Sequence, residues 1–141
     1  MDIHSHNPVD DAHLTQALSE LMTHLRKTQY GVAMGHFEEA LGGSADAFVD
    51  TLARHLLYEE SVLFPSLRRL DSGIAQDIRS LQAEHARLRE LSLDLARSIQ
   101  KRDTWRAYDI ARTFLAELFD HIEREAKVTH RPAHPQVASG A

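Results

Sequence analysis

The sequence predicts an all-α protein folded as an up-down-up-down four-helix bundle. Apolar residues recur at three- and four-residue spacing through four long segments, and no stretch alternates apolar and polar residues with period two. The connections between these segments are short, which makes neighbouring helices antiparallel. A chain of 141 residues is long enough for one bundle with a single core, and it contains no internal repeat.

The first helix is expected to begin at Asp10 or Asp11, either of which can cap its N-terminus, and to continue toward Tyr30. Leucines at helical spacing from residue 14 to residue 25 form its apolar stripe. Its end stays open, because there are several candidate stops: Gly31, Gly35 and the pair Gly42-Gly43.

The second helix begins near Ser44, a good capping residue, and reaches Pro65, which ends or kinks it. The third follows the turn Asp-Ser-Gly at residues 71–73 and continues to about Lys101.

The fourth helix takes Asp103 or Thr104 as its cap and stops before Pro132. The bundle is therefore expected to span residues 9–130. The segments 1–8 and 131–141 are expected to be disordered.

Composition excludes several classes of protein. The chain has no cysteine, which rules out a disulfide framework, a thiol nucleophile and a thiolate metal site. A net charge of −5 disfavours nucleic acid as a partner. No apolar run approaches the roughly 18–20 residues that cross a bilayer, and the N-terminus is polar, so we expect a cytoplasmic protein that does not contact membranes. Ten histidines are the unusual feature.

Three of the predicted apolar stripes each carry a histidine, namely His55, His85 and His121, and two also carry a glutamate one turn later, Glu59 and Glu125. A buried carboxylate costs several kcal/mol unless it is paired or bound to a metal. Residues equidistant from a tight turn lie side by side, and counting from the two later turns brings all five residues to one layer of the bundle. The sequence therefore predicts one cation site in the core.

The first helix offers His13 and His24 on one face, about 16 Å apart along the axis. A turn at Gly42-Gly43 favours His24, and a turn near residues 31–35 favours His13. Glu60 and Glu84 adjoin the proposed ligands but point off the stripes, so we expect them to be solvated or to support a ligand from outside.

Four segments together resemble the hemerythrin-like (HHE cation-binding) domains. Residues 55–65, His-Leu-Leu-Tyr-Glu-Glu-Ser-Val-Leu-Phe-Pro, resemble the second-helix signature. Glu-His-Ala-Arg-Leu at 84–88 and His-Ile-Glu-Arg-Glu at 121–125 are similar to the third- and fourth-helix motifs, and Asp-Ala-His-Leu at 11–14 resembles the first. The likeness covers residues from about 10 to 130.

The resemblance implies two non-haem iron ions (Fe2+/Fe3+) in the bundle core, carboxylate-bridged and joined by an oxo or hydroxo group. It implies imidazole ligands from four histidines and bridging carboxylates from two glutamates: His13, His55, His85, His121, Glu59 and Glu125. The family spacing favours His13, with His24 as the alternative. Imidazole and carboxylate also suit manganese or zinc.

Oxygen-carrying members of the family have a fifth histidine in the third helix and an Asp five residues after the fourth-helix histidine. Here the residues four positions before and after His85 are Leu81 and Arg89, so this fifth histidine is missing. In the fourth helix the carboxylate is Glu125, four residues after His121. The resemblance therefore implies binding of, or reaction with, O2, NO or peroxide in sensing, scavenging or stress response, with a redox activity left open. Iron storage, delivery or iron-centre repair is one alternative, and a metal-free interaction module is another.

Overall fold

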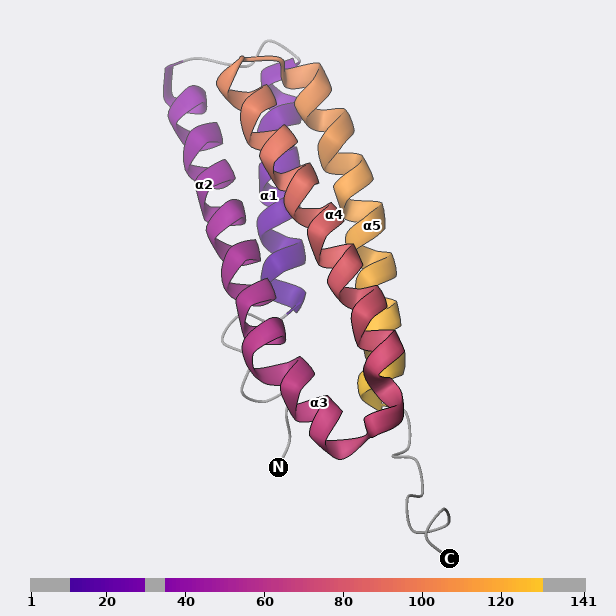
Figure 1. The fold of residues 1–141 in the computed structure, drawn as a ribbon. Coiled ribbons are helices and arrows are strands. Elements are labelled where there is room, and N and C mark those ends of the chain that lie inside the picture. The colour runs from indigo at the N-terminus through magenta and orange to yellow at the C-terminus, as the bar shows by residue number, and fades with distance from the viewer. Residues whose placement is uncertain (1–10, 30–34, 131–141) are drawn as a thin grey trace, which may run out of the picture.

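The computed structural model describes residues 11–29 and 35–130, which form four long helices packed as a bundle (Figure 1). These are α1 (Asp11–Gln29), α2 (Gly35–Tyr58), α4 (Ala75–Gln100) and α5 (Thr104–His130). Each helix runs antiparallel to the next along the chain, and α1 also packs against α5 and α2 against α4. The described residues contain no strand, and the predicted four-helix bundle is confirmed. The segments 1–8 and 131–141, expected to be disordered, lie outside the described residues.

The second helix begins at Gly35, nine residues before the predicted start near Ser44. Gly42 and Gly43 therefore lie inside α2 and do not end a helix, although each glycine costs roughly 0.5–1 kcal/mol relative to alanine. The flanking residues Leu41 and Ala45 are buried in the core, and this packing outweighs the low helix propensity of the glycines. The antiparallel helices α1 and α2 therefore end at Gln29 and begin at Gly35.

The helical path does not end at Pro65. A π-helical turn, η2 (Glu59–Leu63), follows α2 directly, and the short helix α3 (Phe64–Leu70) continues from it. The backbone N–H of Phe64 donates to the carbonyl of Glu59, five residues earlier, which closes the π turn. Pro65 then occupies the first turn of α3, where a missing N–H is tolerated.

The π turn changes which residues face the core. An uninterrupted α-helix, which turns by 100° per residue, would point Val62 inward with Glu59, but Val62 is 41% exposed. The wider turn instead brings Leu63 and Phe64 into the core while Glu59 stays buried. Because of this one-residue change of phase, the same stretch of chain buries both a carboxylate and the apolar residues beyond it.

The turns that frame α4 follow the predicted capping pattern. The Asp71 carboxylate accepts the N–H of Gly73, and a short 3-10 turn, η3 (Ser72–Ile74), leads into α4. At the other end Arg102 has a positive φ of 58°, and the Asp103 carboxylate accepts the N–H of Arg106 at 3.1 Å, which caps α5.

The buried apolar residues form two clusters, which we call the large and the small cluster. The large cluster contains sixteen buried residues from α1, α2, α4 and α5, and the small cluster contains six from η2, α3, η3 and the first turns of α4. Along α4, His85 lies between Leu81 of the small cluster and Leu88 of the large one. A polar layer therefore separates the two parts of the core.

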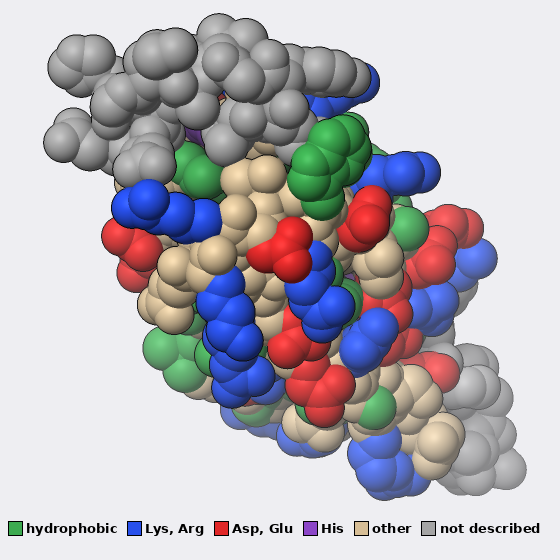
Figure 2. All heavy atoms as spheres, turned by 90° about the horizontal axis from the view of Figure 1, so that it is seen from above, with side chains coloured by type: hydrophobic (Ala, Val, Ile, Leu, Met, Phe, Trp, Pro, Cys, Tyr) green, Lys and Arg blue, Asp and Glu red, His purple; other side chains and the backbone are tan. Residues whose placement is uncertain are grey.

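The outer surface is charged with both signs. On the face in Figure 2, acidic and basic side chains are interleaved over the helices. Among the described residues, no helix combines the length and the apolar character needed to span a membrane.

Candidate metal centre

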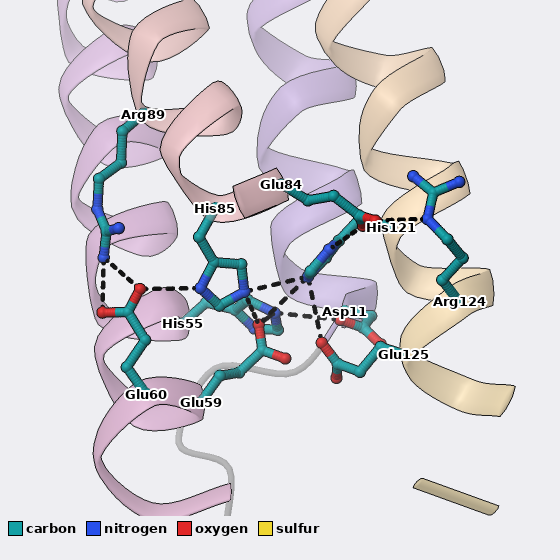
Figure 3. Close-up of polar contacts among 10 residues, drawn as sticks. All are labelled: Asp11, His55, Glu59, Glu60, Glu84, His85, Arg89, His121, Arg124 and Glu125. Carbon is teal, nitrogen blue, oxygen red and sulfur yellow. Dashed lines mark hydrogen bonds and ion pairs between the residues drawn. The ribbon is translucent and has the colours of Figure 1, made fainter. Parts of the chain in front are cut away.

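The polar layer is centred on the carboxylate of Glu59 (Figure 3). Its Oε1 atom lies 3.0 Å from Nε2 of His55, 3.2 Å from Nε2 of His85 and 3.6 Å from Nε2 of His121. Nε2 of His121 also lies 3.2 Å from Oε2 of Glu125. Three imidazoles and two carboxylates, supplied by α2, η2, α4 and α5, thus point toward one another.

These five side chains are shielded from solvent. Glu59 and His85 are 0% exposed, His55 and His121 are 1% exposed, and Glu125 is 7% exposed. The ring of Phe64 stacks on that of His85 at 5.3 Å between centroids and covers it from the side of the small cluster. Ionisable groups so deeply buried need compensation by a proton or a cation.

Two of the histidines contact a second carboxylate through Nδ1, the ring nitrogen that does not face Glu59. Nδ1 of His85 lies 3.0 Å from Oε1 of Glu60, and the carboxylate of Glu60 pairs with Nη2 of Arg89 at 2.8 and 2.9 Å.

His121 is held in the same way. Its Nδ1 lies 2.8 Å from Oε1 of Glu84, and Oε2 of Glu84 accepts from Nε of Arg124 at 2.6 Å. Glu60 and Glu84 therefore join a buried imidazole to a surface arginine and are not simply solvated.

These outer contacts decide the tautomers of the two rings. A carboxylate paired with arginine accepts, so Nδ1 of His85 and Nδ1 of His121 each donate a proton to it. In the neutral rings both Nε2 atoms then carry lone pairs, yet they lie 3.2 Å apart and both face Glu59. Lone pairs directed at one point repel each other unless a positive charge lies between them. The donor set of imidazole nitrogen and carboxylate oxygen is one that Fe, Mn or Zn ions take.

The charges of the layer also favour a bound cation. Burial of Glu59 acts to raise its pKa, but the imidazoles of His121, His55 and His85, which bring positive charge to the carboxylate when Nε2 is protonated, outweigh burial and hold the pKa well below the usual range. Burial acts to lower the pKa of His121, but the carboxylates of Glu59 and Glu84 raise it overall. The layer therefore keeps its carboxylate ionised and attracts positive charge.

One group of donors is compact enough to surround a single ion. Glu59, His85, His121 and Glu125 each offer one ligand atom, and these four atoms lie within 4.8 Å of one another. His55 extends the group on the side of α2.

The structure brings together five of the residues that the sequence singled out, which are His55, Glu59, His85, His121 and Glu125. His13 lies on the exposed side of α1, and His24 is half-buried three turns further along the same helix. The α1 residue that does reach the layer is Asp11, whose Oδ1 lies 3.4 Å from Nε2 of His55.

Sequence reasoning considered Asp11 only as a helix cap, although a signal for it existed. Asp11 precedes Leu14 by three residues and Leu18 by seven, so it continues the apolar stripe of α1. Because the chain reverses after Gln29, the first turn of α1 also lies level with His55.

Comparison with known proteins identifies a family. A family model described as the hemerythrin HHE cation binding domain matches residues 9–131, a span that includes every residue of the layer. Searches among curated proteins and among solved structures found no match.

Proposed function

The chain belongs to the hemerythrin HHE cation-binding domains, and we propose that it binds two iron ions in the polar layer and that the reduced iron pair binds or reacts with O2, NO or peroxide. The observation that carries the proposal is the convergence of three imidazole Nε2 atoms on Oε1 of Glu59, at 3.0, 3.2 and 3.6 Å. A metal-free packing role would not favour such a set, because mutual repulsion of lone pairs costs stability.

The ligands we propose are one residue from the first turn of α1 and the five buried side chains of the layer, which are His55, Glu59, His85, His121 and Glu125. Glu59 lies between the histidines of α2, α4 and α5, which suits a carboxylate that bridges two ions. Two cations also offset the charge of buried carboxylates that have few other partners.

Iron would supply the redox chemistry and the open coordination positions for a small ligand. The protein's own residues orient and shield the site. Glu60 and Glu84 hold the Nδ1 protons of His85 and His121, which directs both Nε2 atoms inward and makes the rings better donors. Phe64 and the two apolar clusters exclude bulk water, so only a small molecule is expected to enter.

The test is to load the metal-free protein with Fe(II) under anaerobic conditions, remove unbound iron by desalting, and measure iron per chain. An absorption spectrum is then recorded while O2, NO or hydrogen peroxide is admitted. We expect two irons per chain and a new charge-transfer band with at least one of the three molecules. Iron at background level would refute iron binding. Bound iron without a spectral response to any of the three would refute the proposed reactivity.

The control is the Glu117→Gln variant. Glu117 pairs with Arg87 between α4 and α5, as Glu84 pairs with Arg124 between the same helices, but Glu117 belongs to no histidine contact of the layer. Iron content and spectrum of this variant should equal those of the wild type.

A further inference from the structure

We propose that Asp11, and not His13, supplies the ligand from α1, and that it does so beside His55. The centre then has two unequal cation positions that share Glu59. The first is bounded by Asp11, His55 and Glu59, and the second by Glu59, His85, His121 and Glu125. This assignment rests on the proposed function, since it concerns how the same centre is completed.

The spacing of the atoms is the first argument. Nε2 of His55 lies 3.0 Å from Oε1 of Glu59 and 3.4 Å from Oδ1 of Asp11 (Figure 3). Nitrogen and oxygen ligands sit about 2.0–2.2 Å from a metal ion, so two ligands of one ion lie roughly 3 Å apart. The nitrogen from α2 therefore already lies at the separation of two ligands of one ion from an oxygen of α1 and from an oxygen of η2.

The second argument is the burial of the Asp11 oxygen that we propose as the ligand atom. The Asp11 side chain as a whole is 43% exposed, yet its Oδ1 atom is covered from solvent where it meets His55. The carboxylate thus directs one oxygen into the layer and leaves the rest of the group at the surface. A carboxylate that served only as a helix cap would have no reason to direct that oxygen at a buried imidazole.

The helix itself separates Asp11 from His13. Residues two apart on an α-helix point about 200° away from each other. Asp11 shares a stripe with the buried Leu14 and Leu18, which fixes the rotation of α1 against the bundle, and His13 is exposed as a result. Bringing His13 to the layer would require α1 to rotate and to withdraw its leucines from the large cluster.

The two positions differ in chemistry. The position at Asp11 has one imidazole and two carboxylates, whereas the other has two imidazoles and two carboxylates. The position at Asp11 also lies at the first turn of α1, where the partly exposed carboxylate is in contact with solvent. We therefore expect it to bind iron more weakly and to be the one through which iron exchanges with solution.

The experiment compares Asp11→Ala with His13→Ala, two variants in the same turn of α1. Both are loaded with Fe(II) anaerobically and titrated, and iron per chain is measured after desalting. For Asp11→Ala we expect the second equivalent of iron to bind at least about tenfold more weakly, so that one iron per chain remains, since even a residue that only supports a ligand changes affinity by 10–100-fold. His13→Ala should retain two.

Circular dichroism and thermal unfolding of the metal-free variants check that both fold. Asp11→Asn provides a second test, because it keeps the size of the side chain and removes only its charge, and it should also lose the second iron. Loss of iron by His13→Ala with retention by Asp11→Ala would overturn the assignment, and so would retention of two irons by both. A wild-type chain that binds no iron would overturn the proposed function and this assignment with it. A wild-type chain that binds two irons, combined with either contrary result for the variants, would overturn the assignment alone.

Discussion

Replacement of Glu59 by glutamine should remove the response of the protein to metal while leaving the fold intact. Glutamine has nearly the same volume as glutamate, so it leaves no cavity at a position that is 0% exposed. What it removes is the negative charge that lies 3.0–3.6 Å from three imidazoles. In the metal-free protein the ionised carboxylate pairs with these imidazoles, in agreement with its lowered pKa, so we expect the metal-free variant to fold but to be less stable than the metal-free wild type.

The size of the effect follows from binding linkage. A cation present at a thousand times its dissociation constant stabilises the folded wild type by about 4 kcal/mol. For a chain of this length each kcal/mol raises Tm by roughly 3–4 °C, so iron should raise the wild-type Tm by about 15 °C. In Glu59→Gln the shared oxygen ligand becomes a neutral amide, and the gain should fall below about 1 kcal/mol, or a few degrees.

The assay is thermal unfolding of both proteins under anaerobic conditions, with and without Fe(II), in which circular dichroism reports the loss of helix. Glu117→Gln is the control. An equal rise in Tm for wild type and Glu59→Gln would show that Glu59 is not a ligand. A metal-free variant that does not fold would show instead that the bundle itself requires Glu59, and the reasoning about the layer would be wrong.

Three further predictions follow from other features. In Glu84→Gln the acceptor for Nδ1 of His121 loses its charge, so iron affinity measured by competition with a chelator should fall about tenfold; unchanged affinity would argue against a supporting role. Gly43→Ala should raise the free energy of unfolding in urea by roughly 0.5–1 kcal/mol, because nothing lies within 4 Å of the added Cβ; a decrease would contradict the helical path through this residue. The metal-free protein should be most stable between about pH 4.5 and 6.5. The lowered pKa of Glu59 gives stability that is complete above its ordinary value of 4.5 and is lost as pH falls through the lowered pKa, whereas the raised pKa of His121 gives stability that is complete below 6.5 and is lost as pH rises through the raised pKa. Urea unfolding across this range checks the profile, and a maximum above pH 8 would contradict it.

The fold and the inward faces of the helices could be predicted because helical periodicity is strong in this chain. The regular spacing of leucines sets the rotation of each helix, and a histidine on such a stripe must point into the core. The position of each residue along the bundle axis could be predicted for α2, α4 and α5, because Asp71 and Asp103 mark tight turns. Those two facts suffice to bring His55, His85 and His121 together.

Other features depend on packing that the pattern does not contain. The pair Gly42-Gly43 has the composition of a helix stop, and only burial of the neighbouring residues keeps α2 helical there. The π turn after Tyr58 departs from the constant rotation per residue that periodicity assumes, so periodicity alone does not predict that Val62 is exposed.

The α1 contribution to the centre was harder still to predict. An aspartate at the start of a helix has an ordinary explanation as a cap, so its position on the apolar stripe does not by itself predict a contact with His55.

The division of the core into two clusters has a consequence for how the chain folds. The small cluster has six buried residues, which is too few to hold α3 and the adjoining ends of α4 and α5 in place without help. The polar layer of histidine and glutamate side chains lies between this end and the sixteen residues of the large cluster. We therefore expect the end with the small cluster to open at lower free energy than the rest of the bundle in the metal-free protein. A cation held by residues on α2, α4 and α5 would fuse them into one unit, so that metal loading and closure of this end become the same event.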